Sequence, residues 1–315
     1  MSANESANWV NAYLDLLKHQ RGLSPHTLSN YRLDFQALLV LAADQSLAQL
    51  QYFDLRRFTS KMHAQGLHAR SIARRLSSWR GFYTWLATQI DLPANPVVGV
   101  KAPRKEKSLP KALGVDDAVH LVAQQAGDTP FALANRAMFE LLYSSGLRVS
   151  ELVSLNLNNR IESNDQNPGW IDFEQAEVHV VGKGNKERIV PVGRCALDAV
   201  SAWLAVRGQL LRTEVHALFL SERGTRMSVR VVQLRLKQHV LQVGTPAKVN
   251  PHVLRHSFAT HMLQSSGDLR AVQEMLGHRS ISATQVYTAL DFQHLAKVYD
   301  AAHPRAHKRT RTSKG

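Results

Sequence analysis

Cysteine is nearly missing from this sequence of 315 residues, which contains Cys195 alone. A single thiol excludes a disulfide framework and a zinc site built from several thiolates. Long apolar runs are missing too, because no stretch approaches the ~20 residues that a membrane-spanning helix needs. The first residues lack the basic and then apolar pattern of a secretory signal. These absences predict a soluble, cytoplasmic protein without a membrane partner.

Acidic residues are few relative to basic ones, with 25 Asp and Glu against 39 Lys and Arg and a net charge of +14. The excess is shared, because the segment up to Lys107 has 14 basic and 7 acidic residues and the rest has 25 and 18. Such a charge favours a polyanionic partner, nucleic acid ahead of a membrane surface. The apolar content of 44% predicts a buried core and excludes a disordered polycation.

Prolines mark a domain boundary about one third of the way along the chain. Pro96, Pro103 and Pro110 interrupt any helix, because proline lacks the backbone donor and restricts the preceding residue. We therefore predict an N-terminal helical domain over residues 1–100, a basic linker over 101–111 and a second domain over 112–315. The linker is either a solvated hinge or a hinge that lies along phosphate, and its composition fits both.

The N-terminal domain has the apolar spacing of four helices. Ser24-Pro25 is a typical helix start, with a capping hydroxyl before a proline at the first helical position. The last helix has its apolar face between Ile72 and Leu86, and several arginines lie off that face. Such a helix either contacts a DNA groove or is an ordinary amphipathic helix. The candidate DNA-contacting residues of this helix and the linker are Arg70, Arg74, Arg75, Arg80, Lys101, Arg104 and Lys105.

After the linker, helical spacing dominates with one β interruption. Residues 176–181 alternate between apolar and polar, and residues 187–192 can pair with them across a turn that contains Gly184-Asn185. The expected fold class is mainly α with a small β-hairpin or sheet. The polar stretch 161–170 is expected to be a surface insertion, because extending a loop costs little free energy.

Several familiar active sites are absent from the sequence. No Gly-x-x-x-x-Gly-Lys-Ser/Thr motif is present, which excludes a P-loop. His252 and His256 have the spacing of a zinc-protease pair, but Val253 stands where that motif needs glutamate, and Arg255 would repel a cation. No pair of carboxylates lies near these histidines in sequence for metal-assisted phosphoryl transfer. No metal or other cofactor is therefore expected.

A set of cationic and hydrogen-bonding residues accompanies one tyrosine instead. Taken alone, each has an ordinary structural alternative: an ion pair with Glu151, a helix cap, a place in the core or a solvated turn. Two of them, His252 and Arg255, are three residues apart and therefore share a helix face. The members of the set are Arg148, Lys183, His252, Arg255, His278 and Tyr287.

In order and local context, these six residues resemble the signature of the tyrosine site-specific recombinases, also called the phage integrase family. The signature reads Arg, Lys, His-x-x-Arg, His or Trp, and Tyr. Here it is found in the segments GLRVSEL, VVGKGNKER, PHVLRHSFATHML, LGH and TQVYTAL. The stretch LSPHTLSNYRLDFQALL is similar to the family's N-terminal core-binding helices, and the ending DFQHLAKVYDAAHPRA is similar to its XerC subfamily. The resemblance covers nearly the whole chain.

The resemblance implies a two-domain, C-shaped clamp with a helical core-binding domain and a tyrosine-recombinase catalytic domain. It also implies a metal-independent transesterification. Tyr287 would attack the scissile phosphate and form a 3′-phosphotyrosyl link, while Arg148 and Arg255 hold the non-bridging oxygens. Glu151 is expected to orient Arg148.

The other residues of the set are implied to handle protons and charge. A phenol of pKa about 10 needs a nearby acceptor or nearby cations to react at neutral pH. His252 would accept the tyrosine proton or orient the phosphate, and His278 would donate a further hydrogen bond. Lys183 would protonate the leaving 5′-oxygen from a hairpin that closes on DNA.

Partners are implied as well. The substrate would be double-stranded DNA at a dif-like site, and no small-molecule substrate is expected. A XerD-type recombinase would complete a cyclic heterotetramer with two of each subunit, in which the helix after Tyr287 docks onto a neighbour. The septal DNA translocase FtsK would regulate this resolution of chromosome dimers before cell division. The open alternatives are a mobile-element integrase, a relaxing topoisomerase and a catalytically silent DNA-binding protein.

Overall fold

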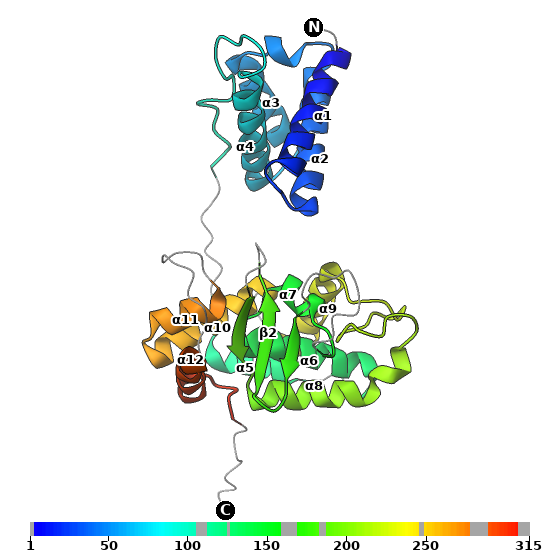
Figure 1. Ribbon diagram of the computed structural model, residues 1–315, viewed down its shortest axis with the longest axis vertical. Coiled ribbons are helices and arrows are strands. Elements are labelled where there is room, and N and C mark those ends of the chain that lie inside the picture. Colours follow the sequence, from blue (N-terminus) through cyan, green and yellow to red (C-terminus); the bar gives the residue numbers. More distant parts are fainter. Residues whose placement is uncertain are drawn as a thin grey trace, which may run out of the picture. The chain divides into compact units, whose positions relative to one another are not determined.

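The computed structural model of the chain describes residues 3–104, 112–124, 127–158, 169–182, 187–245, 249–277 and 289–307. The chain divides into two compact units, residues 1–109 and 110–315 (Figure 1). Helices dominate both units, and the second also contains a small sheet. The expected fold class, mainly α with a small β element in two domains, is confirmed. The C-shaped arrangement and the boundaries at residues 100 and 111 stay predictions.

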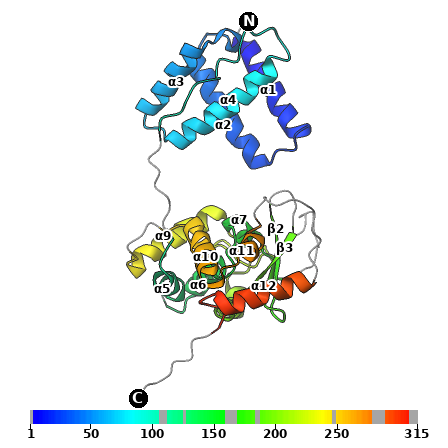
Figure 2. The same cartoon turned by 90° about the vertical axis from the view of Figure 1, so that its left-hand side faces the viewer.

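The helices of the N-terminal unit pack against one another (Figure 2). Their core contains aromatic as well as aliphatic side chains. Ser24 starts the second helix as predicted, since its Oγ accepts a hydrogen bond from the backbone N–H of Thr27 and Pro25 begins the first turn. The ring centroids of Phe35 and Phe82 lie 5.4 Å apart in the middle of the core. The helices are α1 (Ala3–His19), α2 (Pro25–Ala42), the short 3-10 helix η1 (Leu47–Gln49), α3 (Tyr52–Ala64) and α4 (Ala69–Leu86).

The second unit surrounds a central helix, α6 (Pro130–Ser144), whose residues from Ala137 onward are all buried. Thr129 caps this helix by accepting a hydrogen bond from the backbone N–H of Ala132. None of the helices in the described part of the chain is long and apolar enough to cross a membrane. The other elements are α5 (Val115–Ala123), α7 (Val149–Ser154), β1 (Trp170–Asp172), β2 (Glu177–Val181), β3 (Glu187–Pro191), α8 (Arg194–Arg207), η2 (Gly208–Leu210), α9 (Val229–Val243), α10 (Pro251–Ser266), α11 (Leu269–Leu276) and α12 (Ala289–Ala302).

The β interruption is a three-stranded antiparallel sheet in the order β1-β2-β3. β2 and β3 pair as the sequence predicts. The expectation that residues 161–170 form only a surface insertion is wrong at its end. Trp170 begins β1 and pairs with His179, and the two rings stack with their centroids 4.2 Å apart. This packing places Trp170 in the sheet although the residues before it in the sequence are polar. Residues 161–168 lie outside the described residues.

The C-terminal helix α12 packs on its own unit, where it contacts α10 and β3 (Figure 2). Leu295 and Tyr299 are almost fully buried there, and the Tyr299 hydroxyl forms a 2.7 Å hydrogen bond with Ser144 Oγ at the end of α6. After the helix, Arg305 pairs with the buried carboxylate of Glu140. This face of α12 is thus occupied within the unit, and docking of the helix onto a neighbouring protomer stays a prediction.

Candidate active site

Arg148 lies at the junction between α6 and α7. Gly146 turns the chain after α6 with a φ of +56°, and a Cβ at this position would overlap the ring of Phe258, so only glycine fits. The backbone N–H of Arg148 donates to Glu151 Oε2 at 2.7 Å, which makes Glu151 a capping carboxylate in the first turn of α7. The Arg148 side chain is 36% exposed, so its fork can reach an external anion.

Arg255 reaches the same place from α10. Asn250 caps this helix by accepting a hydrogen bond from the backbone N–H of His252. The Arg255 fork is buried, with Nη1 donating to the Gly146 carbonyl and Nη2 donating to the Leu276 carbonyl, each at 2.5 Å. These carbonyls lie at the C-terminal ends of α6 and α11, where backbone acceptors lack helical partners. Arg255 therefore ties two helix ends together beside Arg148.

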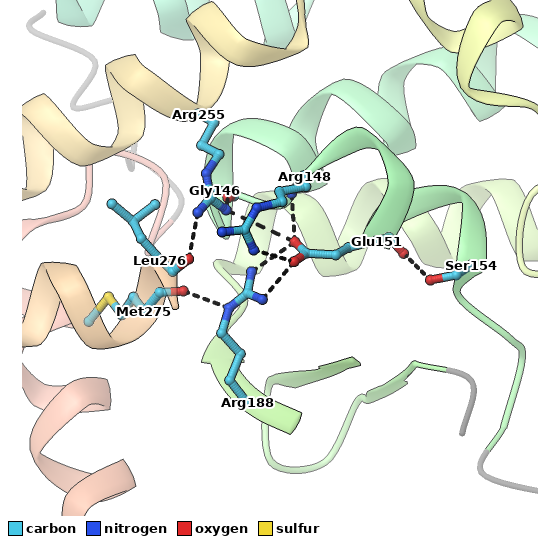
Figure 3. A network of polar contacts seen from close by, with 8 residues as sticks. All are labelled: Gly146, Arg148, Glu151, Ser154, Arg188, Arg255, Met275 and Leu276. Carbon is cyan, nitrogen blue, oxygen red and sulfur yellow. Dashed lines mark hydrogen bonds and ion pairs between the residues drawn. The ribbon is translucent and has the colours of Figure 1, made fainter. Parts of the chain in front are cut away.

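Glu151 joins three guanidinium groups that come from three segments of the chain (Figure 3). Its Oε1 accepts hydrogen bonds from Nη1 of Arg148 and Nη1 of Arg188, both at 2.7 Å. Its Oε2 accepts one from Nη2 of Arg188 at 2.8 Å, and Nη1 of Arg255 lies 4.0 Å from the same oxygen. Three positive charges thus surround one negative charge, which leaves the cluster with a positive surplus.

The cluster is charged near neutral pH. Burial by itself would raise the pKa of Glu151, but the hydrogen bonds and charge of Arg188, with the hydrogen bonds from Arg148, bring this pKa below its ordinary value. Burial, aided by repulsion from Arg148, lowers the pKa of Arg255 to about 10, which still leaves it protonated. A bound anion would relieve the mutual repulsion of the three cations. The arrangement therefore favours an anionic ligand such as a phosphate group.

The structure brings together two of the six predicted site residues, Arg148 and Arg255, around Glu151. His252 is exposed in the first turn of α10, and the cap of that helix is Asn250. Within the described segments, no cluster of three His, Cys, Asp or Glu side chains is placed to hold a metal ion. The three predicted site residues that lie outside the described residues are Lys183, His278 and Tyr287.

Comparison with known protein families shows to which family this chain belongs. Residues 112–294 match the model of the phage integrase family, and residues 10–89 match the model of the phage integrase N-terminal SAM-like domain. The chain belongs to the phage integrase family. It is 54% identical over 310 residues to a tyrosine recombinase XerC of Ralstonia pickettii, which covers 95% of this chain and 94% of the relative.

A second relative agrees with this assignment. The tyrosine recombinase XerC of Escherichia coli O157:H7 is 48% identical over 300 residues, covering 94% of this chain and 96% of the relative. This phage integrase family member is thus a tyrosine recombinase, an enzyme that transfers DNA strands.

The solved structures share its fold. A fragment of lambda integrase, a dimer bound to a COC′ core site, matches with a TM-score of 0.67 at 17% identity and covers 91% of this chain and 99% of that one. The Tn1549 transposon integrase in complex with circular intermediate DNA matches with a TM-score of 0.66 at 18% identity, covering 95% and 97%. At these identities the likeness concerns the fold of the phage integrase family.

Arg188 is a member of the recombinase's arginine cluster that the sequence analysis missed. It is the second residue of β3, in the segment ERIVP, which the sequence analysis assigned to the hairpin and did not consider as part of the site. Arg188 and Val190 share one face of the strand because side chains alternate, and both are buried. A charge on the apolar face of a strand needs a buried partner. That mismatch with the strand pattern was the signal that could have identified it.

The basic residues predicted to contact DNA differ in their surroundings. In the N-terminal unit of the recombinase, Arg74 Nη1 lies 2.6 Å from Oδ2 of the buried Asp34, and Arg75 Nε lies 3.7 Å from Oδ1. Arg80 reaches two backbone carbonyls beyond α4, each at 3.5 Å. These three arginines therefore have contacts within their own unit. Of the others, Arg70, Lys101 and Arg104 are exposed, and Lys105 lies outside the described residues.

Proposed function

We propose that this recombinase cuts and rejoins DNA at a specific site through a 3′-phosphotyrosyl intermediate formed by Tyr287. The observation that carries the proposal is the cluster in which Arg148 and Arg255 approach Glu151 with a surplus of positive charge. Guanidinium forks match the geometry of phosphate oxygens. Fixed cations also stabilise most strongly the charge that builds up in a transition state.

The two arginines would hold the phosphate in different ways. Arg148 is partly exposed and is bonded to Glu151 through Nη1, so its fork can turn toward an incoming phosphate. Arg255 is only 10% exposed, and each of its terminal nitrogens uses one hydrogen on a backbone carbonyl. Each terminal nitrogen has a second N–H that can donate to a non-bridging oxygen. The pair would thereby neutralise the charge that accumulates on those oxygens.

The remaining residues would complete the transfer. The Tyr287 oxygen bonds to phosphorus as the bond to the 5′-oxygen breaks, and His252 accepts the phenolic proton or orients the phosphate. Lys183 gives a proton to the leaving 5′-oxygen, and His278 donates a hydrogen bond to the phosphate. The phosphotyrosyl link conserves the energy of the phosphodiester bond, so attack by a 5′-hydroxyl can rejoin the strand without ATP.

Lys183→Ala is expected to slow cleavage of an ordinary phosphodiester by about 10²-fold or more, because general-acid catalysis contributes about 10²–10⁴-fold. A substrate with sulfur in place of the bridging 5′-oxygen has a better leaving group and should restore the rate. The measurement is single-turnover formation of the covalent adduct on both substrates. Lys186→Ala, in the same segment of the sequence, is the matched control and should behave as wild type. No recovery on the sulfur substrate would remove Lys183 from the general-acid role.

We further propose that the DNA is a dif-type site and that the recombinase resolves chromosome dimers during segregation and cell division. The support is the name of the relatives that are 48–54% identical, tyrosine recombinase XerC. A XerD-type recombinase would be the partner in a cyclic heterotetramer, with the translocase FtsK as regulator. The DNA duplex would be held by the exposed cations of the N-terminal unit and linker, Arg70, Lys101 and Arg104, together with Lys105, Arg74, Arg75 and Arg80.

A nicked dif-like duplex, incubated with and without a XerD-type partner, tests this finer role. We expect a covalent adduct on the dif-like duplex, little on a scrambled duplex, and strand-exchange products only when the partner is present. Relaxation of supercoiled DNA without a partner would indicate a topoisomerase instead. Preference for the attachment site of a mobile element would indicate an integrase, and binding without any cleavage would indicate a silent DNA-binding protein.

A further inference from the structure

Arg188 is the most enclosed of the three guanidinium groups around Glu151. Its side chain is 4% exposed, whereas that of Arg148 is 36% exposed. All three of its nitrogens are engaged, because Nη1 and Nη2 donate to Glu151 and Nε donates to the carbonyl of Met275 at 3.0 Å. An arginine enclosed in this way faces other residues of the protein rather than a substrate.

The geometry shows how Arg188 acts on Glu151. Two parallel hydrogen bonds fix both oxygens of a carboxylate, whereas a single bond leaves the group free to rotate. The oxygens fixed by Arg188 are the same two that accept hydrogen bonds from Arg148, one from Nη1 and one from the backbone N–H (Figure 3). Arg188 therefore sets, through Glu151, the position from which the Arg148 fork reaches outward.

Arg188 also connects the segments that lead to two other predicted catalytic residues. It is in the second position of β3, five residues after Lys183, and its partner Met275 comes three residues before His278. Gly277 ends α11 with a φ of +63°, and a Cβ at this position would lie 3.1 Å from Cδ of Arg188. The end of α11 therefore closes directly against the arginine. One buried side chain thus joins β3, α7 and the end of α11.

We infer that Arg188 is a positioning residue of the recombination reaction, which holds Glu151 and thereby the Arg148 fork in the orientation that binds the scissile phosphate. The inference rests on the proposed function and adds to it a residue that does not touch DNA. Its loss should affect the chemical step more than DNA binding, because many other cations hold the duplex. Removing a group that orients a metal ligand typically costs about 10–100-fold in activity, and we expect a loss of the same order here.

Two variants test the inference, Arg188→Met and Arg188→Lys. Methionine removes all the hydrogen bonds and fills the space, while lysine keeps the charge but cannot bond both oxygens of Glu151 as a fork. At saturating protein, both should slow single-turnover cleavage of the 5′-sulfur substrate by about 10–100-fold, with the Kd for DNA changed less than about threefold. This substrate does not need the general acid, so the loss reports on phosphate binding. Arg235→Met is the matched control. Arg235 is also buried, but it lies in α9 and pairs with Glu222 instead of Glu151.

The decisive measurement is a double-mutant cycle with Arg148→Ala. If Arg188 acts through Arg148, Arg188→Met should slow the Arg148→Ala enzyme less than about threefold. A merely structural role would cost the same factor in both backgrounds. That equal loss, or a wild-type rate for both Arg188 variants, overturns the inference. If circular dichroism shows that Arg188→Met is unfolded, Arg188→Lys, which keeps a buried positive charge beside Glu151, is used in the same cycle.

Failure of the proposed function would give a different result. The wild-type enzyme and Tyr287→Phe would then both form no adduct on any duplex. The inference alone fails when the wild-type enzyme forms the Tyr287 adduct and the Arg188 variants form it equally fast. The Arg235→Met control must cleave at the wild-type rate. A slower rate in the Arg188 variants then comes from the cluster around Glu151 and not from the loss of a buried arginine in general.

Discussion

Replacement of Tyr287 by phenylalanine is expected to abolish the covalent protein–DNA adduct and to leave the DNA affinity within about twofold of wild type. Phenylalanine keeps the ring but has no oxygen to attack phosphorus, so no phosphotyrosyl link can form. Affinity should persist because it comes from phosphate contacts with a chain of net charge +14. The adduct is measured on a nicked duplex by denaturing electrophoresis, and the affinity is measured at one fixed salt concentration.

Tyr52→Phe is the matched control for this substitution. Tyr52 begins α3 in the N-terminal unit and is partly exposed, so removal of its hydroxyl should leave the adduct unchanged. An adduct that persists in Tyr287→Phe would remove Tyr287 from the nucleophile role. Mass spectrometry of the peptide linked to DNA would then identify the residue that replaces it in the mechanism.

Glu151→Gln is expected to destabilise the protein by about 3–5 kcal/mol. Glu151 is 3% exposed and lies within 4.0 Å of three guanidinium groups, those of Arg148, Arg188 and Arg255. Glutamine has nearly the same shape but no charge, so the three cations would be left without compensation in a buried site. The free energy of unfolding is measured by urea denaturation. Added sulfate or DNA should recover part of the loss, because an anion can replace the missing charge.

Glu274→Gln is the control for the loss of a carboxylate. Glu274 pairs with Arg270 on the exposed side of α11, where an ion pair contributes at most about 0.5 kcal/mol. The control should therefore unfold at nearly the wild-type urea concentration. Equal stability of Glu151→Gln and Glu274→Gln would show that the buried carboxylate does not hold the pocket together.

The pH dependence of stability provides an independent check on Glu151. Its pKa is below the ordinary value in the folded state, because Arg188 and Arg148 outweigh the effect of burial. The stabilisation is therefore present above the ordinary pKa of about 4.3 and is lost as the pH falls through the lowered folded pKa. The difference between wild type and Glu151→Gln should shrink below about pH 4. A difference that stays constant from pH 7 to pH 3 would contradict an electrostatic role.

Arg148 and Arg255 were identified from the sequence because their order and local context, in GLRVSEL and PHVLRHSFATHML, match a family signature. Taken alone, neither residue differed from an ordinary structural arginine. The hairpin of β2 and β3 was predictable from a local pattern, since its two strands are close in sequence.

Arg188 could not be placed in the arginine cluster in this way. Its partners are far along the chain, Glu151 at a separation of 37 residues and Met275 at 87. The strand pattern could mark Arg188 as a buried charge, but no local rule tells which distant carboxylate it will pair with. The short strand β1 was missed because three residues are too few to show an alternating pattern. Contacts between segments that are distant in sequence therefore could not be predicted from the sequence.

The helix α6 links Tyr299 and Arg305 to the arginine cluster around Glu151. Glu140 and Ser144 hold Arg305 and the hydroxyl of Tyr299, and the carbonyl of Gly146 just beyond them orients Arg255. Less than two helical turns separate these attachment points. Because closely packed protein interiors transmit strain, a displacement of Tyr299 or Arg305 is expected to reach Arg255 through α6.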